Sequence, residues 1–216
     1  MLTVINYTIY HSPNSYLGVL LADRELAGLP VRVERKPIFI PPERGVKVAD
    51  LIGSQEPPRK GAYHREDCAR WAQHYGIEMH FLAPGVFEER ATRWRQSPFG
   101  REELPARAYY AAVGTGRERD FDRALFWAAW VDGRDVNEES VIADAARSAG
   151  LDAGTLLKQA LGEDVGRTAR AALTAFDHDA APGVPTWVVA GKRFWGKDRV
   201  EWMVREVKRL LATTLG

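Results

Sequence analysis

A serine that directly precedes a proline is the first place where this sequence could carry chemistry. Ser12 is followed by Pro13, a pair typical of a helix start, where the serine side chain accepts from free backbone N–H groups. The same hydroxyl could donate to an anion, such as the thiolate of a bound thiol. A hydrogen bond to a charged partner contributes ~1.5–3 kcal/mol, and the helix N-terminus contributes ~0.3–1 kcal/mol. A total near ~2.7 kcal/mol would lower a thiol pKa by ~2 units. A plain helix cap is the alternative interpretation.

Such a thiol would have to come from outside the chain. Cys68 is the single cysteine among 216 residues, and it falls within a later predicted helix. One cysteine excludes an internal disulfide, a dithiol redox centre and a zinc site with four cysteine ligands. We expect Cys68 to be a small core or boundary residue. We predict no metal site, since no metal-ligand spacing relates His64, His74, His80 and His178.

A second candidate feature is the segment Gly183-Val184-Pro185-Thr186. Pro185 could be a turn proline that simply starts a strand, which is common. Alternatively, the Val184–Pro185 bond is cis, and the N–H and C=O of Val184 remain available for pairing. We predict the cis form. An extended peptide could then pair with Val184 as a short added strand.

The elements that would position these residues begin with a β-α-β unit. Residues 3–10 are β-branched and aromatic, which predicts a buried strand. A helix follows from Ser12 and ends at Gly28, and residues 31–40 begin with the alternation of a second strand. This order favours a parallel pair with a right-handed crossover. Residues 41–60 are rich in proline and glycine and predict a long loop, which in a compact domain is often functional.

The rest of the chain is first helical and then mixed. The pattern is helical over 63–76, and residues 85–162 predict a succession of helices. A helix over 164–179 leads into a strand, a tight turn and an antiparallel strand within 186–195. A last helix is expected over 198–211. The predicted order is therefore βαβ, a helical block, and αββα.

Composition narrows the class of protein. Hydrophobic residues make up 45% and charged residues 27%, which is typical of a soluble globular protein rather than a disordered one. Lys and Arg total 30 against 29 for Asp and Glu, and this balance gives no support for nucleic-acid binding. The start lacks the features of a signal peptide, and no apolar run approaches the ~18 residues of a membrane span. We expect a cytoplasmic protein that binds neither nucleic acid nor membrane.

The predicted order, with Val-Pro-Thr opening the third strand, resembles the thioredoxin fold, and the helical insertion resembles its DsbA-like branch. Redox members of that fold carry C-P-x-C where this chain has Ser12-Pro13-Asn14-Ser15. Four pieces in order are similar to 2-hydroxychromene-2-carboxylate isomerases and kappa-class glutathione transferases: S-P-N-S-Y-L-G at 12–18, K-G-A-Y at 60–63 followed by Asp67 and Arg70-Trp71-Ala72, G-V-P-T at 183–186, and F-W-G-K-D-R at 194–199.

The resemblance implies an α/β architecture and its division. A discontinuous thioredoxin-like domain would comprise residues 1–62 and 161–216, and a helical insertion domain would comprise residues 63–160. It also implies a homodimer.

The resemblance further implies that the outside thiol is glutathione, held beside Ser12. Lys60 matches a lysine that pairs with a glutathione carboxylate, and Asp198 matches an aspartate that receives the γ-glutamyl amine. Taken alone, Lys60 could be a solvated loop cation and Asp198 only a helix cap. The complete set of cofactor-binding residues expected on this basis is Ser12, Ser54, Lys60, Val184, Pro185, Trp195, Lys197 and Asp198.

Two positions depart from the family pattern. His11 stands where the family has an aromatic or aliphatic residue before the serine-proline pair. It could be a general acid/base, since imidazole titrates near neutrality, or a packed histidine at a strand end. Ser54 follows Gly53 where the family has an asparagine that orients the substrate or cofactor, and fewer residues separate it from Lys60.

The activity that the resemblance implies is glutathione-dependent isomerisation in the catabolism of aromatic compounds. A thiolate would add to a conjugated aromatic 2-keto acid or hemiketal, a bond would rotate, and elimination would release the trans isomer. Ser12 and His11 are the expected catalytic residues. A glutathione transferase or peroxidase is one alternative. Another is a non-catalytic DsbA-like binding module that lacks the redox cysteines.

Overall fold

The structure is a computed structural model that describes residues 1–41, 59–83, 85–97, 99 and 102–214. The chain forms two compact units. One consists of Met1–Ile38 with Arg170–Gly216, and the other of Phe39–Ala169. These boundaries lie at 38 and 169, compared with 62 and 160 in the division expected from the sequence.

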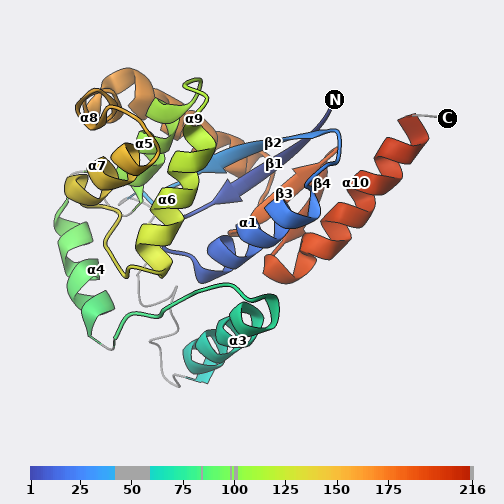
Figure 1. The fold of residues 1–216 in the computed structure, drawn as a ribbon, viewed down its shortest axis with the longest axis horizontal. Coiled ribbons are helices and arrows are strands. Elements are labelled where there is room, and N and C mark those ends of the chain that lie inside the picture. The colour runs from blue at the N-terminus through green and yellow to red at the C-terminus, as the bar shows by residue number, and fades with distance from the viewer. Residues whose placement is uncertain (42–58, 84, 98, 100–101, 215–216) are drawn as a thin grey trace. The chain divides into compact units, whose positions relative to one another are not determined.

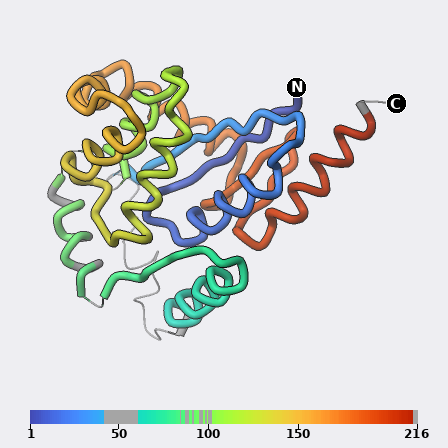
Figure 2. Tube along the Cα trace, in the orientation of Figure 1, coloured from blue at the N-terminus to red at the C-terminus, as the bar shows by residue number. Residues whose placement is uncertain are grey.

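The first unit is built on a four-stranded sheet in the order β2-β1-β3-β4. β1 pairs in parallel with β2 and antiparallel with β3, and β3 pairs antiparallel with β4. Figure 2 shows the blue N-terminal strands beside the orange C-terminal hairpin, so the two ends of the chain share one sheet. The parallel pair and the hairpin predicted from the sequence are confirmed. The strands and the crossover helix are β1 (Leu2–Thr8), α1 (Pro13–Glu25), β2 (Val31–Pro37), β3 (Thr186–Val189) and β4 (Lys192–Trp195).

Helices cover both faces of this sheet. α1 packs beside α10 (Val200–Thr214), as Figure 1 shows. The short 3-10 helix η2 (Lys197–Arg199) directly precedes α10. Trp187 of β3 is fully buried on the α1 face. Alternation along β1 places Tyr7 on the opposite face, where its ring lies 5.4 Å from that of Phe176 in α9 (Glu163–His178). Its hydroxyl donates to Asp179 over 2.7 Å, and burial together with this bond raises the pKa of Tyr7.

Local chemistry explains where the strands turn and end. Ala190 and Gly191 have φ of 47° and 78°, the positive values that a tight two-residue hairpin turn requires. The first two strands are shorter than the predicted 3–10 and 31–40. The β1–β2 ladder stops at the Thr8–Pro37 pair, where the Ile38 N–H donates to the Thr8 carbonyl at 2.9 Å.

The second unit is helical, as predicted for residues 85–162. α6 (Glu118–Trp130) buries one face, with Phe121 and Leu125 fully enclosed, while Trp127 is half exposed. α3 begins at Arg59, so the loop expected over 41–60 is wrong at its last two residues. None of the described helices combines the length and apolarity needed to cross a membrane. The helices of this unit, besides the start of α9, are α3 (Arg59–Tyr75), α4 (Val86–Gln96), α5 (Glu103–Ala112), α6 (Glu118–Trp130), α7 (Glu139–Ser148) and α8 (Ala153–Leu161).

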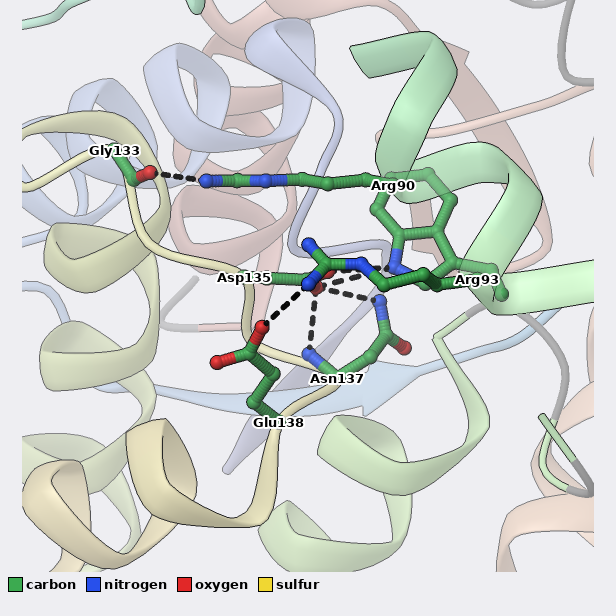
Figure 3. A network of polar contacts seen from close by, with 7 residues as sticks. Arg90, Arg93, Gly133, Asp135, Asn137 and Glu138 are labelled. Carbon is green, nitrogen blue, oxygen red and sulfur yellow. Dashed lines mark hydrogen bonds and ion pairs between the residues drawn. The ribbon is translucent and has the colours of Figure 1, made fainter. Parts of the chain in front are cut away.

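A buried carboxylate ties α4 to the segment between α6 and α7 (Figure 3). Asp135 is 5% exposed and accepts from the Trp94 indole at 2.9 Å and from the Asn137 backbone at 3.0 Å. Arg93 lies 3.7 Å away and supplies positive charge, and Arg90 donates to the Gly133 carbonyl over 2.6 Å. Because a buried charge is stable only when it is well partnered, this network fixes the packing of α4 within the helical unit.

Candidate active site at the start of α1

Ser12 caps α1 and keeps a proton to donate. It has extended backbone angles, and its Oγ accepts from the Ser15 N–H at 3.2 Å, while Pro13 occupies the first helical position. The expected helix cap is therefore confirmed. Capping uses an oxygen lone pair and leaves the O–H hydrogen available. Ser12 is half-buried, and no described residue accepts from its hydroxyl. Capping and donation to a ligand are thus compatible roles.

The segment before β3 presents an unpaired stretch of backbone. The Val184–Pro185 bond is cis, as predicted. The Pro185 carbonyl accepts from Gly196 N–H at 2.9 Å, and the Thr186 hydroxyl donates to the Gly183 carbonyl at 2.6 Å. Between them, the Val184 backbone forms no hydrogen bond with any residue that the structure describes. Its N–H and C=O could pair with an extended ligand.

Gly18 brings this segment against α1. A Cβ at Gly18 would lie 3.1 Å from Cγ of Pro185 and 2.6 Å from Cη2 of Trp187. The proline ring and the indole therefore rest directly on the glycine backbone. Gly18 lies six residues after Ser12, roughly 9 Å along the helix axis. The Pro185 segment thus packs against α1 within the first unit, about two turns from the Ser12 cap.

The turn from β4 into η2 supplies the remaining residues of this site. Trp195 is 54% exposed, and its indole Nε1 would lie 2.9 Å from a Cβ at Gly183, so the ring covers the residue beside Val184. Asp198 is exposed and pairs with Arg199 at 3.0 Å. Lys197 is only 6% exposed and engages other protein groups, and η2 packs against α1. A buried lysine here was not expected from the sequence.

Three expected site residues are placed differently from the rest. His11 directly precedes Ser12 but is 9% exposed and contacts other protein groups. Lys60 lies in the first turn of α3, in the second unit, and its side chain is outside the part that the structure describes. Ser54 also lies outside the described residues. Ser12, the Val184 segment and Asp198 all belong to the first unit, where Pro185 packs on Gly18 of α1 and η2 packs against α1.

Two contributors to the site were not singled out from the sequence. Gly18 sets the approach of Pro185, and the fully buried Ser15 accepts from the Ile9 N–H at 3.4 Å. A glycine inside an otherwise apolar helix is a signal for Gly18, because it costs ~1 kcal/mol relative to alanine unless close packing requires it. The described residues contain no cluster of three or more histidine, cysteine or acidic side chains that could hold a metal ion. Cys68 is fully buried, as expected.

Solved structures share this fold over nearly their whole length. The chain is similar to a 2-hydroxychromene-2-carboxylate isomerase, with a TM-score of 0.77 and 21% identity over 99% of this chain and 98% of that one. A probable DsbA oxidoreductase from Streptomyces coelicolor has a TM-score of 0.77 and 17% identity, covering 98% and 91% of the two chains. The cytosolic disulfide reductase DsbM from Pseudomonas aeruginosa has a TM-score of 0.63 and 18% identity, covering 99% and 98%.

Among curated proteins, none matches the chain in sequence. The model of the DSBA-like thioredoxin domain matches residues 3–208. This match spans both units and includes the cap of α1, the Pro185 segment and the turn into η2. The chain belongs to the DSBA-like thioredoxin domain family.

Proposed function

We propose that this protein is a glutathione-dependent isomerase of the 2-hydroxychromene-2-carboxylate isomerase type, acting on a conjugated aromatic 2-keto acid or hemiketal. The observation that carries the proposal is the start of α1, where a serine hydroxyl caps the helix and keeps its proton free to donate. This is the arrangement that would stabilise a thiolate brought by a cofactor.

Because the chain has a single cysteine, it has no cysteine pair for dithiol chemistry. Some structural neighbours are described as oxidoreductases or disulfide reductases, and disulfide exchange needs an accessible thiolate. Here Ser12 and Ser15 occupy the two positions of the cysteine pair, and the single cysteine, Cys68, is fully buried. A cofactor thiol would restore the missing nucleophile, in line with the isomerase described for another neighbour.

The expected cofactor-binding residues would suit a tripeptide with two carboxylates and one amine. The Val184 N–H and C=O are available for pairing with the backbone of an extended peptide. The exposed Trp195 ring gives an apolar wall beside Val184. The Asp198 carboxylate would receive the amine, and we assign one ligand carboxylate to Lys60.

The chemistry divides between cofactor and protein. When bound, glutathione supplies a thiolate for reversible addition to the conjugated double bond of the substrate, so that the resulting single bond can rotate before elimination restores the thiol. The Ser12 hydroxyl donates to the sulfur and, with the N-terminus of α1, favours its anionic form. If the thiol pKa falls from ~8.5 by ~2 units, the thiolate fraction at about pH 7 rises from ~3% to ~75%.

The test follows the ultraviolet absorbance of the thiolate against pH with glutathione bound. The wild type should show a thiol pKa ~2 units below the free value, and Ser12→Ala should return it towards that value. Ser140→Ala, an exposed serine on α7, is the matched control and should behave as wild type. A bound thiol that titrates as in free solution, or a Ser12→Ala variant identical to wild type, would refute the role of Ser12.

Turnover distinguishes the competing activities. Isomerisation of 2-hydroxychromene-2-carboxylate, followed with and without glutathione, should depend on the cofactor. An equal rate without glutathione would discard the proposal. An acidified thiol with no isomerisation would favour a kappa-type transferase or peroxidase, and an absence of acidification would favour a non-catalytic binding module.

A further inference from the structure

A closed set of three hydrogen bonds links the end of β1 to the first turn of α1. The Ile9 N–H donates to the Ser15 Oγ at 3.4 Å, and the Ser15 N–H donates to the Ser12 Oγ at 3.2 Å. The Ser12 N–H in turn donates to the Ile9 carbonyl at 3.2 Å. Both the N–H and the C=O of Ile9 are therefore tied to the two serines that flank Pro13-Asn14.

Within this ring, Ser15 contributes its side chain from the protein interior. It is fully buried, and Ile9 is 6% exposed. The Ser15 hydroxyl is thus withdrawn from solvent and accepts from the backbone of the segment between β1 and Ser12. Ser12, by contrast, is half-buried and caps the end of the helix.

We propose that Ser15 is a positioning residue for the cofactor thiolate and that it acts through Ser12. Its hydroxyl holds the Ile9 peptide, and the Ile9 carbonyl holds the Ser12 backbone. With the Ser12 backbone fixed and one Oγ lone pair occupied by the Ser15 N–H, the Ser12 O–H has few directions left. A donor that is oriented in advance loses less entropy when it binds an anion. This inference rests on the proposed glutathione site.

The decisive experiment is a double-mutant cycle read as the pKa of the bound glutathione thiol. Ser15→Ala should raise this pKa by about half as much as Ser12→Ala. Because Ser15 acts through Ser12, the Ser12→Ala/Ser15→Ala double variant should match Ser12→Ala alone. Affinity for S-methylglutathione, which has no thiol to ionise, should stay within about twofold of wild type in Ser15→Ala.

Two further measurements separate positioning from packing. Ser15→Thr and Ser15→Val have nearly the same size and differ in the hydroxyl, so Thr should keep a lower thiol pKa than Val. Amide hydrogen exchange without glutathione reports on the three hydrogen bonds themselves. Exchange at the Ile9 and Ser12 N–H groups should become faster in Ser15→Ala, while exchange at the Tyr7 N–H within β1 should change little.

The outcomes distinguish a failure of the Ser15 proposal from a failure of the proposed function. If the wild type acidifies glutathione but Ser15→Ala has the same thiol pKa, the role of Ser15 is wrong and the proposed function stands. Effects of Ser12→Ala and Ser15→Ala that add in full would also overturn it, because the two residues would then act independently. A wild type that leaves the thiol unacidified overturns both proposals.

Discussion

Gly18 determines how closely the Pro185 segment can approach α1. Alanine in place of glycine inside a helix normally adds up to ~1 kcal/mol of stability. At Gly18 the added Cβ would lie 2.6 Å from the Trp187 ring and 3.1 Å from Pro185, and overpacking of this kind costs ~1–3 kcal/mol. We therefore predict that Gly18→Ala lowers the free energy of unfolding by about 1–2 kcal/mol, measured by urea denaturation.

Gly154 on α8 provides the control for this prediction. Its added Cβ would meet only Asp152 Oδ1, at an ordinary 3.7 Å. Gly154→Ala should therefore leave stability unchanged or slightly higher. If both variants gain stability equally, the contact between α1 and the Pro185 segment is looser than its geometry indicates.

At the scale of elements, an ion pair on the surface joins β4 to α10. Glu206 of α10 accepts from Lys192 of β4 at 3.0 Å and from Arg209 at 2.6 Å. The hydrogen bonds from Arg209 and Lys192 lower the pKa of Glu206 from 4.5 to about 2. Because the folded-state pKa is below the unfolded one, this contribution to stability is present above pH 4.5 and is lost as the pH falls towards 2.

Glu206→Gln tests that linkage. The variant should have a lower melting temperature than wild type near neutral pH, and the gap should close as the pH falls from 4.5 towards 2. Glu201→Gln, on the same helix and paired with Arg205, controls for the loss of one negative charge. A gap that stays constant across this pH range would contradict a link that depends on the ionised carboxylate.

Local signals made most elements of the sheet unit predictable. Ser12-Pro13 marked the start of α1, and Ala190-Gly191 marked the turn of the hairpin, because each signal depends on residues adjacent in sequence. Contacts between distant segments left no such mark. The approach of Gly18 to Pro185 joins residues more than 160 positions apart, and the burial of Lys197 depends on how η2 packs against α1.

At the scale of the whole molecule, the family membership and the single cysteine together constrain which chemistry the chain can perform. The DSBA-like thioredoxin domain spans both units. At the start of α1, however, the chain has Ser12 and Ser15 and no cysteine. The sheet unit therefore presents a serine-capped helix and, at Val184, a backbone without hydrogen bonds to any described residue, with no cysteine at either place. Function must then depend on the ligand that pairs with the Val184 backbone.

Two charged residues are proposed as anchors of the ligand. Asp198 belongs to the sheet unit and Lys60 to the helical unit. Asp198 pairs with Arg199 in an exposed position, and such pairs contribute only ~0–1 kcal/mol, so a ligand amine can displace Arg199 at little cost. Removing either anchor takes a charged partner from the ligand, a loss of ~1–3 kcal/mol.

We therefore predict that Lys60→Ala and Asp198→Ala each weaken glutathione binding by ~10-fold or more, since a factor of ten corresponds to ~1.4 kcal/mol. Calorimetric titration measures this, and Lys158→Ala and Asp164→Ala, which remove exposed charges of the same kinds, should bind as wild type. Binding energy that is available only in the folded state also stabilises it, by ~2.7 kcal/mol at a ligand concentration of about 100 times Kd. Saturating glutathione should therefore raise the melting temperature of the wild type, and less so in each anchor variant. Unchanged affinity in both variants would place the ligand elsewhere, whereas a loss in Asp198→Ala alone would remove Lys60 from the anchors.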